Sequence, residues 1–176
     1  DDLEAQYATR LGERHALTWG GGYRQSRDRF ANGPILQFSP THRTLRWTNL
    51  FAQDEFALAP ALRATAGLRL EHNAYTGTEV LPSLRLAWDH VPGAMLWAAA
   101  SRTVRAPARI DRELRLLDPA SDGQQYLVAG GPDMQSEVAR VLELGYRAQP
   151  AAAPSLAVTL FYSDYARLRT LEPQGG

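Results

Sequence analysis

The sequence lacks cysteine and lysine, and it contains no long apolar run. Without cysteine, the chain has no disulfide bonds, no thiolate catalysis and no zinc–thiolate site. A membrane-spanning helix needs about 18 or more consecutive apolar residues, and no such stretch occurs. All 19 basic residues are arginine, and the 19 acidic residues bring the formal net charge to zero. Composition therefore gives no support for binding to nucleic acid.

Apolar and polar residues alternate along eight stretches of the chain, a period that is typical of β-strands with two different faces. In the clearest stretch, Leu62–Glu71, every second residue from Leu62 to Leu70 is apolar, and the residues between them include Arg63, Arg69 and Glu71. The strands are expected at residues 2–11, 15–25, 44–58, 61–74, 80–90, 94–104, 135–148 and 155–166.

The connections between these strands alternate between short and long. Residues 12–14, 58–61, 90–93 and 149–154 form short connections that contain Gly or Pro, whereas residues 26–43 and 104–134 are long and polar, and 73–79 is intermediate. This alternation indicates an all-β, antiparallel, up-and-down transmembrane β-barrel segment of about eight strands, with long outer loops and short periplasmic turns. Its strands hide their lipid-facing residues in every second position, so ordinary hydropathy is compatible with a membrane location.

Two segments do not fit a single period. Met134–Arg147 has apolar residues at helical spacing and also on one strand face, so periodicity alone leaves both interpretations open. Within the second long loop, Pro107–Leu117 has the pattern of a short amphipathic helix, with Pro107 in its first turn and Ile110, Leu114 and Leu117 as its apolar stripe.

Six segments in this order resemble the middle of the barrel of TonB-dependent outer-membrane receptors, over residues 45–172. They are Phe51–Glu55, Gly67–Asn73 followed by Tyr75–Gly77, Pro82–Trp88, Trp97–Pro107, Ser136–Glu137 with Glu143–Arg147, and Phe161–Tyr165 with Leu168–Arg169. The resemblance implies that the segment around Glu143 is a strand. It also implies a location in the outer membrane of a Gram-negative bacterium.

The resemblance further implies energised uptake of a scarce nutrient, most often a ferric siderophore, haem or cobalamin, with no catalysis and no resident cofactor. In this family, TonB acts through a plug domain that precedes the barrel. The sequence shows no plug, no TonB-contacting segment and no closing strand that ends on an aromatic residue, and it opens on Asp1 without a signal segment. We therefore expect residues 1–176 to be a partial barrel domain, a fragment of a receptor that contacts TonB only through the missing plug.

Arginines recur every three or four residues in the second long loop, at Arg105, Arg109, Arg112 and Arg115. Guanidinium groups bind carboxylates and phosphates through paired hydrogen bonds. These four residues are therefore candidates to bind an anionic metal chelate or the phosphates of lipopolysaccharide. The alternative is a solvated loop in which they pair with acidic neighbours, namely Asp111, Glu113 and Asp118.

Strand parity places six charged side chains on the side expected to face the barrel lumen, and we expect them to pair across strands or with a plug. They are Arg63, Arg69, Glu71, Arg85, Glu143 and Arg147. No metal site is expected, because Glu71 and His72 are adjacent on a strand and point to opposite faces. No hydrolase elbow, phosphate-binding glycine loop or metalloprotease motif occurs, which argues against an enzyme.

Two other functions remain open from the sequence. The chain could be a complete eight-stranded outer-membrane barrel that serves in adhesion or as a structural protein, since eight strands suffice to close a small barrel. It could also be a soluble β-barrel or sandwich that binds a small apolar ligand. The soluble alternative predicts that the apolar rows of the strands are covered, because large exposed apolar patches aggregate in water.

Overall fold

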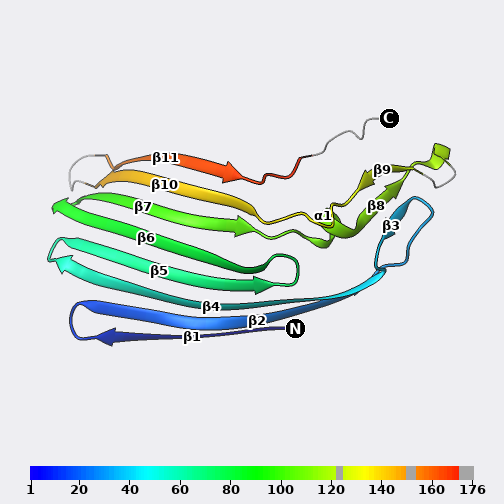
Figure 1. Ribbon diagram of the computed structural model, residues 1–176. Coiled ribbons are helices and arrows are strands. Elements are labelled where there is room, and N and C mark those ends of the chain that lie inside the picture. The colour runs from blue at the N-terminus through cyan, green and yellow to red at the C-terminus, as the bar shows by residue number, and fades with distance from the viewer. Residues whose placement is uncertain (122–124, 150–153, 171–176) are drawn as a thin grey trace.

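The computed structural model describes residues 1–121, 125–149 and 154–170. Its main element is one curved antiparallel sheet (Figure 1). Strands that follow one another in the sequence lie side by side in this sheet, except that the short strands of the two long connections form a separate sheet. In sheet order the strands are β1 (Asp2–Leu11), β2 (His15–Arg29), β4 (His42–Ala59), β5 (Leu62–Asn73), β6 (Gly77–Val91), β7 (Ala94–Arg105), β10 (Glu137–Ala148) and β11 (Leu156–Ala166).

The register gives the sheet two chemically different faces. On the apolar face, Leu68 of β5 lies between Ala52 of β4 and Pro82 of β6, and the next pairs on this face are Leu50 with Leu70 and Leu84 with Ala66. On the polar face, Arg69 lies between Phe51 and Leu81. The alternation read from the sequence therefore survives across neighbouring strands, and the antiparallel all-β fold with a meander topology is confirmed.

The apolar face is largely uncovered. Leu50 is 67% exposed and Leu160 is 66% exposed, and exposed leucine, tryptophan and tyrosine side chains occur on this face from β1 to β11. No second layer of the described residues packs on this face of the sheet, so its apolar side chains stay exposed. Few apolar side chains are buried among the described residues, namely Leu45, Ala64, Pro107, Leu117 and Val138.

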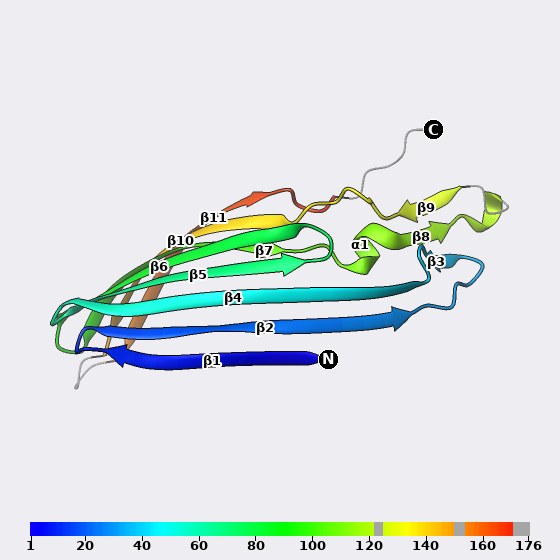
Figure 2. The same ribbon diagram turned by 60° about the horizontal axis from the view of Figure 1, so that its bottom comes forward.

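The short turns gather at one end of the sheet. Those that join β1 to β2, β4 to β5 and β6 to β7 lie together at this end, and the longer connections lie at the opposite end, which we call the loop end (Figures 1 and 2). Gly12 and Gly93 occupy the short turns with φ angles of 65° and 79°, a left-handed region that glycine adopts without steric cost. The fourth short connection, expected at 149–154, lies mostly outside the described residues.

The loop end contains elements that the alternation did not predict. A second small sheet combines β3 (Leu36–Phe38), β8 (Leu114–Leu117) and β9 (Tyr126–Ala129), and a short 3₁₀ turn, η1, spans Pro119–Ser121. Strands β2, β4 and β6 are also longer than expected at this end. The strand interpretation of the segment around Glu143 is confirmed, because β10 pairs with both β7 and β11.

The prediction of a helix over Pro107–Leu117 was wrong for the second half of this segment. Helix α1 covers only Arg109–Glu113, and the chain then continues as β8, in which Leu116 pairs with Leu36 and Leu114 pairs with Phe38. This distant strand partner overrides the local helical period. The apolar stripe does not form, since Ile110 is exposed while Leu117 is buried.

The sheet has two open edges. β1 pairs only with β2 and β11 pairs only with β10, and no pairing joins β1 to β11 among the described residues, so the sheet is an open arc. No helix in the described ranges is long and apolar enough to cross a membrane.

Candidate functional site: an arginine-rich loop cluster

The best-buried polar side chains lie where the long connections meet at the loop end. We call this region the loop cluster; it comprises α1, β3, β8, β9 and the turn Ala74–Thr76. The fully or nearly buried polar residues of the described chain all lie in it or directly beneath it. They are Asn73, Arg109, Asp111, Glu113 and Ser136.

Asp111 fixes the start of α1. Its Oδ2 atom accepts a hydrogen bond of 2.8 Å from the backbone N–H of Ala108, which would otherwise be unsatisfied at the helix N-terminus. The same carboxylate binds Arg105 Nη1 at 3.2 Å and Arg169 Nη1 at 2.6 Å. Asp111 therefore joins the end of β7 and the segment that follows β11 to the helix.

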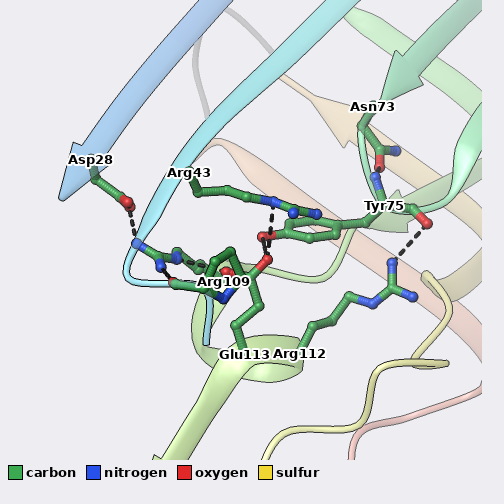
Figure 3. Close-up of polar contacts among 8 residues, drawn as sticks. Asp28, Arg43, Asn73, Tyr75, Arg109, Arg112 and Glu113 are labelled. Carbon is green, nitrogen blue, oxygen red and sulfur yellow. Dashed lines mark hydrogen bonds and ion pairs between the residues drawn. The ribbon is translucent and has the colours of Figure 1, made fainter. Parts of the chain in front are cut away.

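Glu113 is the centre of a second charged group that joins three separate parts of the chain (Figure 3). Its Oε1 atom accepts a hydrogen bond from the Tyr75 hydroxyl at 3.1 Å and forms an ion pair with Arg43 Nε, also at 3.1 Å. Its Oε2 atom accepts one from Arg109 Nε at 2.7 Å, across one turn of α1. A carboxylate that is only 8% exposed thus has several donors, as a buried charge requires.

Arg109 is the most enclosed of the arginines, with 9% of its surface exposed. Besides Glu113, it binds the carboxylate of Asp28 at the end of β2 and the carbonyl oxygen of Pro40. Its guanidinium group also lies over the ring of Phe38, 4.9 Å from the centroid. Arg109 therefore joins α1 to the end of β2 and to the first long connection, at Phe38 and Pro40.

Tyr75 lies between two guanidinium groups. Asn73 shapes its turn by accepting hydrogen bonds from the backbone N–H groups of Tyr75 and Thr76 at 3.0 and 2.9 Å. Arg112 donates to the carbonyl oxygen of Tyr75 at 2.8 Å, and the guanidinium groups of Arg43 and Arg112 lie 5.7 and 5.1 Å from the ring centroid. Burial and the negative charge of Glu113 raise the pKa of Tyr75 to about 12.

The four arginines singled out from the sequence all lie in or beside this cluster, but they differ in what they bind. Arg105 pairs with Glu137 at 3.0 Å as well as with Asp111, and Arg109 is held by Asp28 and Glu113. Arg112 binds the backbone and ring of Tyr75. Arg115 is exposed, and its one described polar contact is a 3.4 Å hydrogen bond to the Tyr126 hydroxyl.

Arg105 and Arg109 therefore fit the alternative in which the loop arginines pair with acidic neighbours and do not bind a ligand. Of the three expected acidic partners, Asp111 and Glu113 do pair with arginine, whereas Asp118 accepts a hydrogen bond from the backbone N–H of Ala120 and shapes the η1 turn. Arg112 and Arg115 have no carboxylate partner among the described residues. Both line a depression of about 310 Å³, together with Arg43, Tyr75 and Glu113.

Sequence reasoning did not identify Asp28, Arg43 or Tyr75 as members of this site. The first two are direct partners across β2 and β4, so strand parity gives a signal that they share the polar face near the loop end. Nothing local indicates that α1 packs against them. Tyr75 stands in one of the segments that resemble the receptor family, but nothing in the sequence indicates its contact with Glu113.

The six charged residues expected in the lumen share the polar face. The register pairs Arg63 with Ala57, Arg69 with Phe51 and Glu143 with Ala99, and the other three follow the same parity. Arg63 lies 3.3 Å from Asp89 and Arg69 lies 3.5 Å from Glu71, so two ion pairs form on this face. Arg147 donates to Gln149. That the polar face lines a lumen is part of the proposal below.

No constellation of three or more potential metal ligands occurs in the described ranges. Glu71 and His72 lie on opposite faces, since Glu71 pairs with Glu79 while His72 pairs with Thr78 on the apolar side. His72 Nδ1 lies 3.0 Å from the hydroxyl of Thr78. The depression presents the guanidinium groups of Arg112 and Arg115 beside the Glu113 carboxylate, and guanidinium groups bind anionic groups through paired hydrogen bonds.

Comparison with known proteins gives a family and a fold. A family model described as TonB dependent receptor-like, beta-barrel matches residues 1–176. An iron-regulated outer membrane virulence protein of Vibrio cholerae serotype O1 (strain ATCC 39541 / Classical Ogawa 395 / O395) is 29% identical over 163 residues, in a match that covers 88% of this chain and 23% of that protein.

Two solved structures share the arrangement of the sheet. The siderophore receptor PirA from Pseudomonas aeruginosa superposes with a TM-score of 0.75 at 22% identity, over 93% of this chain and 30% of that chain. A mutant of the ferric enterobactin receptor from the same organism, solved in complex with enterobactin, gives a TM-score of 0.72 at 22% identity, over 93% of this chain and 26% of that chain. The chain thus spans about a quarter of the length of the proteins it matches.

Proposed function

The chain belongs to the TonB-dependent receptor β-barrel family of the outer membrane, and from that premise we propose that it forms an arc of the barrel wall, with its outer loops, in a receptor for a ferric siderophore or a similar iron or cobalamin compound. The loop end faces the cell exterior and the short turns face the periplasm. In the complete receptor, uptake is energised by TonB through a plug region outside this chain, and the chain itself performs no catalysis.

One observation carries the proposal, namely the uncovered apolar face that runs over all eight strands. In water such a face is an aggregation hazard, but in a bilayer the apolar chains of the lipids cover it. The polar face, with its arginines and glutamates, is then directed to a hydrated barrel interior. This disposition disfavours the soluble ligand-binding alternative.

The two open edges support a wall segment over a self-contained barrel. An exposed edge strand presents unpaired N–H and C=O groups, which cannot be left unsatisfied in lipid. In a larger barrel, β1 and β11 would each pair with a further strand. A self-contained barrel would instead require β1 and β11 to pair with each other, which they do not do in the described structure.

The loop cluster supports binding of an anionic chelate at the outer surface. Arg112 and Arg115 line the depression of about 310 Å³, and their charges have no carboxylate partner among the described residues, since Arg112 donates to the carbonyl oxygen of Tyr75 and Arg115 to the hydroxyl of Tyr126. Arg105 and Arg109 are bound within the protein, and in this proposal they hold the loops in place. The names of the similar receptors, one of which was solved with enterobactin, favour a siderophore as the ligand.

Uptake of compounds labelled with radioactive iron, or with radioactive cobalt for cobalamin, tests the proposal in cells that lack their own receptors for these compounds. The receptor that contains this chain is expressed with and without TonB, and uptake is measured for ferric catecholate and hydroxamate siderophores, haem and cobalamin. We expect uptake of at least one of these compounds that depends on TonB. Uptake of none of them, from a receptor that is correctly placed in the outer membrane, would overturn the transport proposal.

The matched variants Arg115→Gln and Arg14→Gln locate the binding site. Arg14 lies in the short turn at the opposite end of the sheet, so its loss removes the same charge without approaching the loops. We expect weaker binding of the transported compound for Arg115→Gln only. Equal effects of the two variants would remove the loop cluster as the binding site while leaving the transport proposal intact.

A further inference from the structure

The two most deeply buried polar side chains of the described residues lie beneath the loop cluster. Ser136 has no exposed surface and Asn73 has 2%. Asn73 ends β5, whereas Ser136 comes directly before β10, and the strands β6 and β7 lie between these two in the sheet. A buried polar side chain is costly unless its hydrogen bonds are made. The partners of the two residues therefore indicate what they hold in place.

One hydroxyl group joins the two buried side chains. Thr76 Oγ1 lies 2.9 Å from Ser136 Oγ, and it accepts a hydrogen bond of 2.8 Å from Asn73 Nδ2. Asn73 Oδ1 in turn accepts hydrogen bonds from the backbone N–H groups of Tyr75 and Thr76. Asparagine side chains stabilise turns through such contacts with the backbone. A chain of hydrogen bonds thus runs from the start of β10 to the turn Ala74–Thr76.

This turn determines where the guanidinium group of Arg112 lies. Arg112 donates a hydrogen bond of 2.8 Å to the carbonyl oxygen of Tyr75, and its guanidinium group lies 5.1 Å from the centroid of the Tyr75 ring (Figure 3). Arg115, which also lines the depression, instead contacts the hydroxyl and the ring of Tyr126. Arg112 therefore depends on the position of the turn, whereas Arg115 has a different support.

From these contacts we propose that Asn73, Thr76 and Ser136 are positioning residues for ligand binding at the depression. They fix the carbonyl group of Tyr75, and this group holds Arg112 in place. The inference rests on the proposed binding of an anionic chelate by Arg112. The three side chains do not line the depression, so they act through the turn and not by contact with the ligand. Loss of the central hydroxyl group leaves buried partners without a hydrogen bond, which disturbs the turn.

Two substitutions at Thr76 separate the effect of the hydroxyl group from that of side-chain shape. Thr76→Val replaces the hydroxyl group by a methyl group, and Thr76→Ser keeps it. Thr78→Val is the matched control, because it makes the same chemical change two residues farther along, on the apolar side of β6, where Thr78 contacts His72. Each variant is made in the receptor that contains this chain, and heat-modifiable migration on a gel shows that its barrel is folded.

Amide hydrogen exchange of the purified receptor tests the turn without a ligand. For Thr76→Val we expect exchange about ten-fold faster in the turn Ala74–Thr76 and in α1, because buried groups lose a hydrogen-bond partner. Thr76→Ser and Thr78→Val are expected to exchange like the wild type. Unchanged exchange in Thr76→Val would overturn the proposal, whatever the receptor transports.

Ligand binding tests whether the turn acts through Arg112. Ferric enterobactin, a ferric trihydroxamate, haem and cobalamin are titrated against the wild type, with tryptophan fluorescence as the readout, and the compound that binds most tightly is used for the variants. We expect about ten-fold weaker binding for Thr76→Val and wild-type binding for Thr76→Ser. When Thr76→Val is combined with Arg112→Gln it should cause no further loss, whereas with Arg115→Gln the two losses should multiply.

A role limited to general stability has a different signature from a positioning role. It would give multiplied losses in both combinations, or equal losses of binding in Thr76→Val and Thr78→Val, and either result would overturn this inference while leaving the proposed function intact. A folded wild-type receptor that binds none of the four compounds would overturn the proposed function, and with it the ligand-binding role of these residues.

Discussion

In the eight-stranded sheet, large apolar side chains are exposed along a whole face, whereas in the loop cluster the best-buried side chains are charged. Leu50 of the sheet is 67% exposed, while Arg109 and Glu113 of the cluster are 9% and 8% exposed. The two regions therefore invert the usual relation between burial and polarity. A bilayer explains the first region, because lipid takes the place of a covering layer of protein.

The loop cluster obtains its order in a different way. It has few apolar side chains to bury, and its parts are joined by guanidinium groups, of which that of Arg109 contacts three segments. A buried charge is costly unless it is fully paired, so such a cluster is stable only when all of its members are in place. The comparison suggests that the wall tolerates local changes of polar residues, whereas the cluster responds strongly to the loss of one arginine.

Arg109→Met is expected to have the largest effect. The variant leaves the nearly buried Glu113 without one of its two arginines and removes the link to Asp28. Breaking a buried pair by removing one partner costs about 3–5 kcal/mol. We expect loss of amide hydrogen-exchange protection in α1 and β8, with the sheet unaffected. Arg115→Met is the control, and similar deprotection in both variants would contradict a specific role for Arg109.

Leu68→Arg tests the wall and is expected to rank second. Leu68 lies near the middle of β5 on the apolar face, and arginine at the bilayer midplane costs about 2–4 kcal/mol. Thr65→Arg is the control, because Thr65 pairs with Glu55 and Arg85 on the polar face. Folding into lipid vesicles, followed by urea titration, measures both variants. Equal destabilisation would refute the assignment of the two faces.

Tyr75→Phe is expected to have a smaller effect on the cluster. It removes one hydrogen bond to an ionised Glu113, which contributes about 1.5 kcal/mol, while both arginine contacts of Glu113 remain. Local hydrogen exchange of the turn Ala74–Thr76 measures the loss. A change as large as that of Arg109→Met would show that the phenol, and not the arginine, holds the cluster together.

The same tyrosine predicts a pH dependence. Its pKa of about 12 in the folded protein exceeds the unfolded value of about 10, so the folded state holds the phenol proton more tightly. The stabilisation is complete below about pH 10 and is lost as the pH rises through about 12. Ultraviolet titration of the receptor should show a late-ionising tyrosine that is missing in Tyr75→Phe. An unchanged titration curve would contradict the raised pKa.

Arg63→Gln is expected to have the smallest effect. Arg63 and Asp89 form an ion pair at 3.3 Å on the polar face, and each side chain is about half exposed. Such pairs contribute about 0–1 kcal/mol. Urea titration should therefore place this variant within about 1 kcal/mol of the wild type. A loss comparable to that of Arg109→Met would mean that the two regions do not differ in their dependence on charge.

Much of the wall was predictable from the sequence because a strand needs only local information. The alternation in Leu62–Glu71 assigned the two faces of β5, and the register confirms which residues share each face. Glycines at positions 12 and 93 marked two of the short turns. The ambiguous segment around Glu143 could not be decided by period, since its residues fit both a helix and a strand, and only its two strand neighbours settle it.

The sequence by itself determined the strands, their faces and the presence of an arginine-rich loop, because each depends on residues close together in the chain. The pair between Arg109 and Glu113 was also within reach, since the two are one helical turn apart. Only the tertiary structure decided that Arg43 and Tyr75 share Glu113, and that Leu114–Leu117 is a strand beside β3. Those contacts join segments far apart in the sequence, and no local pattern encodes which distant partner will satisfy a buried charge or an open strand edge.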